Sequence, residues 1–433
     1  MAQVLPFQGY LYNIEKVGDL SKVLSLPYDK IPSQLREKYL ERSPYHFVRL
    51  IRPENYERAR QLWRDWRDKD IFIQDRKPSF YVYQQEFTLP SGISKKRTGC
   101  VGIVELKEFG NGIYPHEITF PGPKEDRFQL LKATHANLGQ IFMIYRDSQQ
   151  KISPLLEEAA STAPFISVYM EDLGETHRLW KIQDPAKVQE ISRAFQNLPL
   201  YIADGHHRYE TALSFYQSQL QKAKSPEQVR PYGYRMATLV NIQDPGLVIL
   251  PTHRMIRLLR RLSSQEIKEK LSPYFSFHSV ASLQEGEIWL EQKQEKIKED
   301  QKRVKLRFIL VLPGERLGLE WKDPAKLGEF GLSEIFWEVP VAVLHKIVLE
   351  SLLEHHSSQR DEGHDIGFAR SSEEVVEKVE KGVYSLGFLV PSLSIEAFQK
   401  VTSHGERLPQ KSTDFYPKML SGMTIYSMED SFP

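Results

Sequence analysis

The chain has 433 residues, of which 27% are charged, and its formal net charge is +1. This length exceeds what one hydrophobic core usually organises, so we expect two or three lobes. The balanced charge excludes a general attraction to nucleic acid or anionic membrane, and the single cysteine, Cys100, excludes an internal disulfide. No apolar run approaches the roughly 20 residues that span a bilayer. The first ten residues lack the pattern of a signal peptide, so we expect a cytoplasmic protein.

The first hundred residues alternate predicted helices and strands. Prolines hold residues 27–32 extended, which places Tyr28 and Asp29 on a loop. Aromatic and apolar residues at helical spacing then predict an amphipathic helix, and two apolar runs across a Pro-Ser-Gly turn predict a hairpin. The expected elements are a strand over 47–51, a helix over 54–69 and hairpin strands over 80–89 and 100–106.

A loop rich in glycine and proline carries a dense polar cluster, ahead of a helix expected from about residue 126 to 138. Loops of this length are usually functional or disordered. The mixture of charges argues against disorder, and a solvated loop is the alternative. A zinc-protease pattern is excluded, because no second histidine stands four residues after the first. The candidate site residues of this cluster are His116, Glu117, Lys124, Asp126 and Arg127.

The stretch 198–213 organises the rest of the chain. Its apolar start predicts a buried strand up to residue 203, and the spacing after residue 208 predicts a helix. A strand that turns directly into a helix leaves backbone N–H groups and a dipole that favour an anion. A glycine in that turn lets a ligand approach closely. The residues between strand and helix are Asp204, Gly205, His206, His207 and Arg208.

Positive charge in the first turn of a helix opposes the helix dipole. Arg208 and the two histidines before it therefore predict a bound phosphate. The alternative is purely structural: Asp204 caps the helix, Gly205 eases the turn and the histidines bind neighbouring carbonyls.

Strands and helices continue to alternate through the middle of the chain. One predicted strand ends in a polar group, Thr252, His253 and Arg254, and strand ends are where α/β sheets commonly bind ligands. A surface turn is the alternative at this point. The other expected elements are strands over 141–145, 165–170, 177–181, 236–242, 247–250, 308–312 and 317–321, and helices over 185–197 and 339–353.

Two polar stretches in this part suggest no ligand. Residues 287–305 are the most charged piece of a peripheral helical region, 261–305. The stretch 355–365 is rich in histidine and aspartate, but its spacing matches no known ligand set, so we expect a mobile loop. No resident metal site is expected.

The last motif spans residues 408–422 and combines two cations, two hydroxyls and two aromatics. Such groups recognise phosphate or carboxylate. No glycine-rich loop precedes its first lysine, which excludes a P-loop. We therefore expect this loop to fold back over a binding site, using Lys411, Ser412, Thr413 and Lys418.

Four blocks together resemble the family catalogued as domain of unknown function 1015, in an order that runs through nearly the whole chain. These blocks are residues 115–127, 203–213, 241–254 and 411–422. The run from Asp204 to Arg208 is also similar to the signature loop of the ParB and sulfiredoxin superfamily. In that superfamily the loop holds nucleotide phosphates, and free-serine kinases carry the same Asp-Gly-His-His-Arg run.

Two branches of the superfamily are excluded. Sulfiredoxin places a catalytic cysteine in the loop, whereas His206 follows Gly205 directly here. ParB partition proteins add a helix-turn-helix region and a basic surface, and the sequence shows neither.

The resemblance implies an α/β (mixed α+β) fold, with a ParB/sulfiredoxin-like nucleotide-binding core and additional N-terminal and C-terminal α/β regions. We expect three regions: 1–258 with the phosphate-binding core, 259–330 as a mostly helical and hairpin connection, and 331–433 as an α/β region that closes the site.

The implied function is a small-molecule phosphotransferase, favouring a nucleotide-dependent kinase of free serine. A phosphoserine phosphatase-type hydrolase and a non-catalytic nucleotide-binding regulator are the alternatives. The expected ligands are ATP or ADP, Mg²⁺, and serine or phosphoserine, with no nucleic acid and no membrane partner.

Each candidate residue has an expected role in this scheme. Gly205, His207 and Arg208 hold phosphate, and the C-terminal lysines and hydroxyls close the site. Asp204 takes a proton or binds Mg²⁺, with Glu117 and Asp126 as rival carboxylates. In a phosphatase, His206 or His207 would act on the phosphoester. The expected substrate-binding residues are His116, Lys124, Asp126, Arg127, Thr252, His253 and Arg254.

Overall fold

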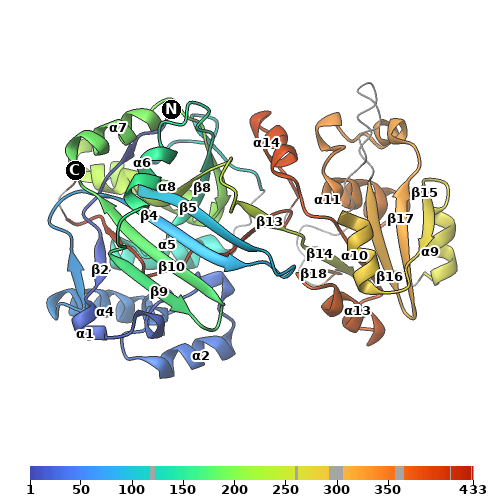
Figure 1. The fold of residues 1–433 in the computed structure, drawn as a ribbon, viewed down its shortest axis with the longest axis horizontal. Helices are drawn as coiled ribbons and strands as arrows, with labels where there is room; N and C mark the ends of the chain where they lie inside the picture. The colour runs from blue at the N-terminus through green and yellow to red at the C-terminus, as the bar shows by residue number, and fades with distance from the viewer. Residues whose placement is uncertain are drawn as a thin grey trace. The chain divides into compact units, whose positions relative to one another are not determined.

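The computed structural model describes residues 1–117, 122–258, 262–291, 306–355, 365–409, 411–430 and 432. The fold is mixed α/β, as expected, and backbone contacts divide it into two compact units that each contain their own sheet (Figure 1). Unit 1 comprises Met1–Pro115, Thr119–Val248 and Phe415–Pro433, and unit 2 comprises His116–Ile118 and Ile249–Asp414.

This division differs from the three regions expected from the sequence. Residues 259–330 and most of 331–433 share one core, because Phe308 and Leu344 belong to the same cluster of buried side chains. The chain then leaves unit 2, and residues 415–433 return to unit 1. A sequence boundary near residue 330 therefore does not separate two folding units.

Unit 1 is built on a nine-stranded sheet. Strands β8 and β12 run parallel and are buried along their whole length, which explains why both are nearly continuous apolar runs. Strands β11 and β6 are also parallel, and the other pairings in this sheet are antiparallel. The strand order is β6 (Ile113–Tyr114), β11 (Leu200–Asp204), β8 (Ile141–Tyr145), β12 (Tyr234–Asn241), β5 (Ser94–Glu105), β4 (Phe80–Thr88), β10 (Glu175–Ile182) and β9 (Ile166–Met170), with β1 (Val4–Leu5) paired to β5.

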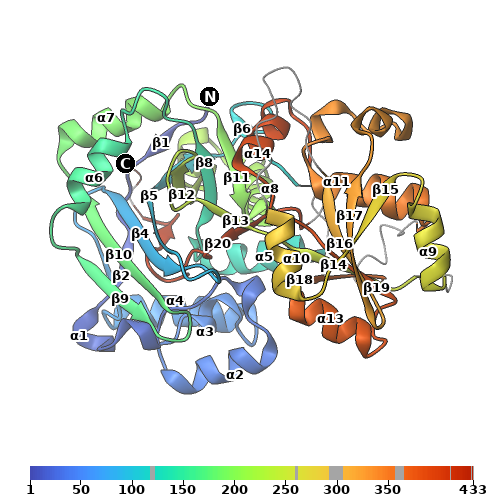
Figure 2. The same cartoon turned by 45° about the vertical axis from the view of Figure 1, so that its right-hand side comes forward.

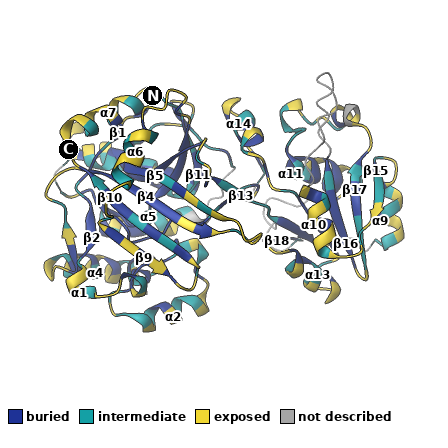
Figure 3. Cartoon of the chain, in the orientation of Figure 1, coloured by how far each residue is buried: buried dark blue, intermediate teal, exposed yellow. Residues whose placement is uncertain are grey.

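Helices surround this sheet, and two short ladders complete the unit (Figure 2). Helix α8 packs on α5 and on β8, and α6 packs on β4, β5 and β10. Figure 3 shows the buried sheet and the more exposed helices. The helices are α1 (Ile14–Val17), α2 (Ser33–Arg42), α3 (Val48–Ile51), α4 (Tyr56–Asp68), α5 (Gly122–Thr134), α6 (Ser153–Ala160), α7 (Pro185–Phe195) and α8 (His206–Leu220), with 3-10 turns η1 (Leu20–Lys22), η2 (Tyr28–Lys30) and η3 (Pro226–Gly233). The ladders pair β2 (Tyr10–Tyr12) with β3 (Phe72–Gln74), and β7 (Ala136–Asn137) with β21 (Tyr426–Ser427).

The amphipathic helix expected over 54–69 is confirmed as α4, which buries Ala59, Trp63 and Trp66. The strand expected over 47–51 is wrong, because this segment forms the short helix α3. A short buried apolar run has no periodicity that separates strand from helix. The buried His46 ring stabilises the start of this helix, since its Nδ1 accepts a hydrogen bond of 3.2 Å from the Val48 N–H.

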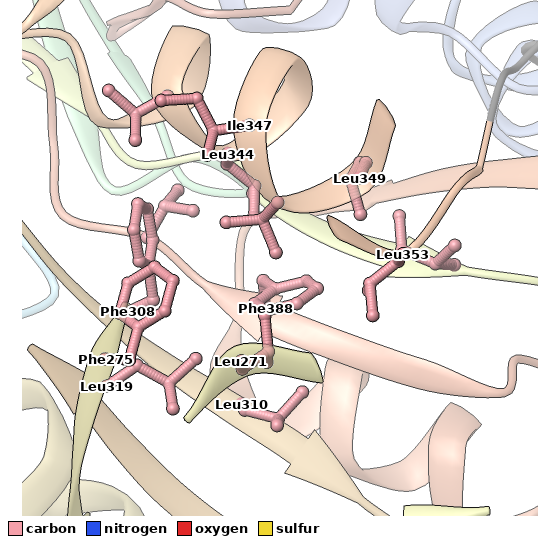
Figure 4. Close-up of a cluster of buried hydrophobic side chains, with 14 of the residues drawn as sticks. Leu271, Phe275, Phe308, Leu310, Leu319, Leu344, Ile347, Leu349, Leu353 and Phe388 are labelled. Carbon is pink, nitrogen blue, oxygen red and sulfur yellow. The ribbon is translucent and has the colours of Figure 1, made fainter. Parts of the chain in front are cut away.

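Unit 2 is built on a six-stranded sheet whose neighbouring strands are all antiparallel. Side chains alternate along β16: Phe308, Leu310 and Leu312 enter one buried cluster, shown in Figure 4, while Ile309 and Val311 enter another. This period of two gives the sheet an apolar layer on each face. The strand order is β15 (Phe275–Ser279), β17 (Glu315–Trp321), β16 (Arg307–Leu312), β19 (Leu386–Leu389), β14 (His253–Ile256) and β18 (Ile366–Ala369).

The helices of unit 2 supply the partners of these two layers. Ile347 of the π-helix η6 (Leu344–Leu352) and Leu271 of α9 (Ser264–Leu271) join the first cluster. Leu290 of α10 (Leu283–Glu291) and Val375 of α13 (Ser372–Glu380) join the second. The other elements of this part are β13 (Val248–Leu250), η4 (Pro324–Phe330), η5 (Glu334–Phe336), α11 (Pro340–Val343), α14 (Ile395–Ser403) and β20 (Asp414–Tyr416).

Some expectations fall outside the described residues. Helix α10 covers the start of the charged stretch 287–305, but residues 292–305 are not described. Residues 356–364 of the histidine-rich stretch and the loop residues 118–121 are also not described. Within the described ranges, no helix combines the length and apolar character needed to cross a bilayer.

Candidate functional site

The junction of β11 and α8 forms the strand-turn-helix expected from the sequence. Asp204 is the last residue of β11, and α8 begins at His206. Gly205 lies between them with φ 95°, a left-handed conformation that glycine adopts readily. No described side chain caps the start of α8, so the structural alternative in which Asp204 caps this helix is not observed. A helix start without a side-chain cap favours an anion.

Asp204 is held between two cations. Its Oδ2 accepts a hydrogen bond of 2.6 Å from Arg208 Nη2, and its Oδ1 lies 3.4 Å from Lys418 Nζ. Burial by itself would raise the pKa of this carboxyl, but Lys418, Arg208 and Lys30 together lower it below its ordinary value. Asp204 therefore carries a negative charge throughout the neutral range.

Arg208 folds back across the turn. Its guanidinium also donates to the Gln140 carbonyl, and a Cβ added to Gly205 would lie 2.9 Å from Arg208 Nη2. The arginine thus has a structural partner, Asp204, four residues before it. This ion pair offsets the unfavourable helix dipole, so its position in the first turn does not by itself require a phosphate.

The C-terminal segment that carries Lys418 is clamped onto the sheet. Arg97 of β5 donates to the carbonyls of Tyr416 (3.0 Å) and Pro417 (2.5 Å), and Gln85 of β4 donates to the carbonyl of Lys418 (3.0 Å). Arg97 and Gln85 are also bonded to each other (2.5 Å). Both side chains are buried, so these bonds are made without competition from water. This clamp brings Lys418 to Asp204.

Behind the clamp lies a buried polar chain. The Tyr83 hydroxyl accepts from the Leu420 N–H (3.3 Å) and lies 2.8 Å from His177 Nδ1. His177 Nε2 is 3.2 Å from Glu175 Oε2. Burial lowers the pKa of His177, against the opposing effect of Glu175. This chain anchors the same C-terminal segment at a further point.

The other candidates of unit 1 lie along α5 and α8. Lys124 forms an ion pair of 3.0 Å with Glu210, and Asp126 accepts a hydrogen bond of 2.9 Å from Tyr56. Arg127 stacks on the ring of Tyr28 at 4.0 Å, which brings the N-terminal loop to this side of the unit. His206 is buried and His207 is partly exposed.

The remaining candidates gather in unit 2, although they come from three separate motifs. His116 Nε2 lies 2.5 Å from Thr413 Oγ1, and Arg254 Nη2 donates to the Lys411 carbonyl at 2.9 Å. Glu117 pairs with Leu408 in a parallel bridge. The C-terminal motif is thus divided: Lys418 belongs to unit 1, whereas Lys411, Ser412 and Thr413 belong to unit 2.

Thr252, His253 and Arg254 follow the end of β13, as expected, but the last two already belong to the next strand. His253 and Arg254 start β14 and are buried there, with His253 Nδ1 accepting from the Val390 N–H at 3.2 Å. Burial and the neighbouring Arg254 lower the pKa of His253 to about 4. Burial also lowers the pKa of Arg254 to about 9, opposed by Glu117.

The donor set at Asp204 does not fit Mg²⁺. This ion is usually bound through one or two carboxylates together with substrate phosphates, and both oxygens of Asp204 face cations. In the part of the chain that the structure describes, no group of three or more His, Cys, Asp or Glu side chains is placed to hold a metal ion.

The residues that build the clamp were not among those predicted from the sequence: Tyr83, Gln85 and Arg97, with Lys30 among the charges that act on Asp204. A signal was present for Gln85, which lies inside the strand predicted over 80–89, whereas Arg97 precedes the strand predicted over 100–106. A buried polar side chain in a strand needs a hydrogen-bond partner. The partner, however, lies more than 300 residues away in the sequence.

The fold and site define a mixed α/β protein with a cationic, glycine-containing turn at a strand end. Residues 4–344 match the family described as "Protein of unknown function (DUF1015)", and the chain belongs to this family. The resemblance seen in the sequence is thereby confirmed. No curated protein matches the chain.

The solved structures that match this chain are distant in sequence and have low TM-scores. A conserved hypothetical protein from Pyrococcus furiosus is 12% identical, covering 76% of this chain and 96% of that chain, with a TM-score of 0.34. A free serine kinase in complex with AMP is 12% identical, covering 73% and 86%, with a TM-score of 0.34. A C-terminally truncated SbnI from Staphylococcus aureus is 10% identical, covering 74% and 85%, with a TM-score of 0.35.

Proposed function

We propose that this protein is a nucleotide-dependent phosphotransferase that acts on a small hydroxyl compound, with free serine as the favoured substrate. The observation that carries the proposal is the turn at Gly205. There the start of α8 has no side-chain cap, and Lys418 and Arg208 lie beside it on the ionised Asp204. A phosphate group is the ligand that such a start and such cations favour.

Phosphoryl transfer needs positioning and charge neutralisation more than covalent help from the protein. The N–H groups after Gly205 would hold phosphate oxygens, with Lys418 and Arg208 neutralising the charge that develops on them. The substrate hydroxyl attacks the terminal phosphorus, the bond to the leaving nucleotide breaks, and the hydroxyl proton is released.

Asp204 has a different role in this proposal from the one expected from the sequence. Its pKa is lowered by Lys418 and Arg208 despite its burial, so it is a weak proton acceptor near neutral pH. We assign it to orienting the two cations. In a loose transition state the negative charge resides on the phosphoryl oxygens, and cations matter more than a strong base.

The test is a product assay on the purified full chain with serine and ATP or ADP. We expect phosphoserine to form only when nucleotide and serine are both present, and turnover to fall at least tenfold in Lys418→Met. Phosphate release from phosphoserine without nucleotide would favour a hydrolase. Nucleotide binding without any product would favour a regulator.

A further inference from the structure

Three arginines converge on one small cavity of unit 1. The cavity measures about 50 Å³, and its lining includes Arg127, Arg208 and Arg235, together with Gly139, Thr211 and Ser421. Leucine side chains complete the wall. A cavity needs roughly 10–15 Å³ to hold one water, so this space accommodates several waters or one small polyatomic ion.

Arg235 carries a charge without a carboxylate partner among the described residues. It lies on β12, is 5% exposed, and donates from Nη2 to the Gly139 carbonyl at 2.9 Å. Its buried Nε has no hydrogen-bond partner in the part of the chain that the structure describes. Among the ion pairs of the described residues, Arg208 is balanced by Asp204 and Arg127 by Asp126, but none includes Arg235.

An unbalanced buried cation is costly unless something pairs with it. Burial, and then the nearby Arg208 and Arg127, lower the pKa of Arg235 to about 9, so the side chain is still charged at neutral pH. A structural arginine of this kind would normally face a carboxylate. Here it lines a cavity instead.

We propose that this cavity binds the carboxylate or phosphate group of a small molecule, held by Arg235 and closed by Arg208 and Arg127. A planar guanidinium matches the geometry of such a group, and the apolar wall strengthens the interaction by excluding water. Thr211 and Ser421 also line the cavity. The Thr211 hydroxyl donates to the Lys124 carbonyl at 3.4 Å, so Ser421 supplies the further hydroxyl donor.

The proposal of this site does not depend on the proposed phosphoryl transfer, although the two sites share Arg208. Its central residue lies on β12 rather than on the β11–α8 turn, and it would bind an oxyanion in a protein with no kinase activity. Arg208 takes part in both, through Asp204 at the turn and through the cavity wall.

The test measures the binding of inorganic phosphate and of acetate to the full chain by calorimetry, at constant ionic strength set with chloride. We expect one saturable site for at least one probe, with affinity reduced at least tenfold in Arg235→Met. The probe that binds identifies the chemical class. Arg60→Met is the matched control, because Arg60 is exposed and pairs with Glu57 away from the cavity, and its affinity should equal that of the wild type.

Arg235→Met removes a buried hydrogen bond and is expected to lower stability, so a second variant fills the cavity without replacing an arginine. In Gly139→Ala the new Cβ would lie 3.5 Å from Arg208 Nη1 and 3.6 Å from Ser421 Oγ, both ordinary contacts. We expect this variant to fold and to lose anion affinity. The proposal is overturned if neither probe binds the wild type, or if Gly139→Ala binds as tightly as the wild type. Either result would leave the product assay for phosphoryl transfer unaffected.

Discussion

The side-chain amide of Gln85 donates a hydrogen bond of 3.0 Å to the backbone carbonyl of Lys418, although the two residues are 333 positions apart. With Arg97, it fixes the backbone that carries Lys418 towards Asp204. The cation beside the glycine turn is therefore positioned by buried side chains of β4 and β5.

Arg97→Met should release the C-terminal segment. The change removes hydrogen bonds to the carbonyls of Tyr416 and Pro417, and bonds to a charged donor contribute about 1.5–3 kcal/mol. We expect a loss of stability of that order and faster amide hydrogen exchange over 416–422. Arg178→Met is the control, because Arg178 lies on the same sheet and pairs only with the exposed Glu86 among the contacts described. Equal exchange rates in both variants would contradict the clamp.

Lys418→Met should weaken nucleotide binding. It removes one of the two cations bonded to Asp204 while keeping the aliphatic stem. Losing one charged hydrogen bond of about 1.5 kcal/mol corresponds to roughly a tenfold rise in Kd. Calorimetric titration with ATP measures this change.

The comparison variant is Lys411→Met. This lysine comes from the same sequence motif, but its backbone carbonyl is bound by Arg254 in unit 2. We expect a smaller effect on the Kd for ATP than in Lys418→Met. The reverse order would mean that Asp204 and Lys418 form a structural ion pair away from the nucleotide.

Gly205→Ala should destabilise the protein. Replacing a glycine that serves only ligand binding would leave the stability unchanged. The backbone has φ 95°, and a new Cβ would lie 2.9–3.0 Å from the Arg208 guanidinium, which is itself tied to Asp204. The left-handed conformation costs an alanine about 1–2 kcal/mol. Gly92→Ala shares the positive φ of 82° but has open space around it. We expect Gly205→Ala to lower Tm further than Gly92→Ala, and equal losses would show that Arg208 moves aside freely.

Acid should destabilise the protein through His46. Burial, then Arg42 and Arg49, lower the pKa of His46 to about 3. Between that value and about 6.5 the unfolded chain binds a proton that the folded chain does not, so stability falls as pH falls. At pH 5 the loss from this residue is about 2 kcal/mol.

Urea unfolding at pH 7 and pH 5 tests this prediction. His46→Asn keeps an acceptor for the Val48 N–H and should show a smaller difference between the two pH values than the wild type. His404→Asn, at an exposed histidine, should keep the wild-type difference. An unchanged difference in His46→Asn would show that other groups cause the acid sensitivity.

The sequence by itself determined the local features of this protein. The strand over 141–145 and the turn from strand to helix at Gly205 are where the pattern predicts them. Apolar periodicity and a glycine between strand and helix act over a few residues, so they are readable without knowing the fold. Short segments such as 47–51 could not be assigned from the sequence in this way, because their burial arises from distant contacts.

Only the tertiary structure decided which polar residues meet. Lys418 reaches Asp204 across 214 positions, while Lys411, seven residues before it, belongs to the other unit. Arg235 lies just before the strand expected over 236–242, and only the pairing of β12 with β8 and β5 brings it to the cavity beside Arg208. Strand order and register determine these long-range contacts. Both depend on how the whole sheet assembles rather than on any local pattern.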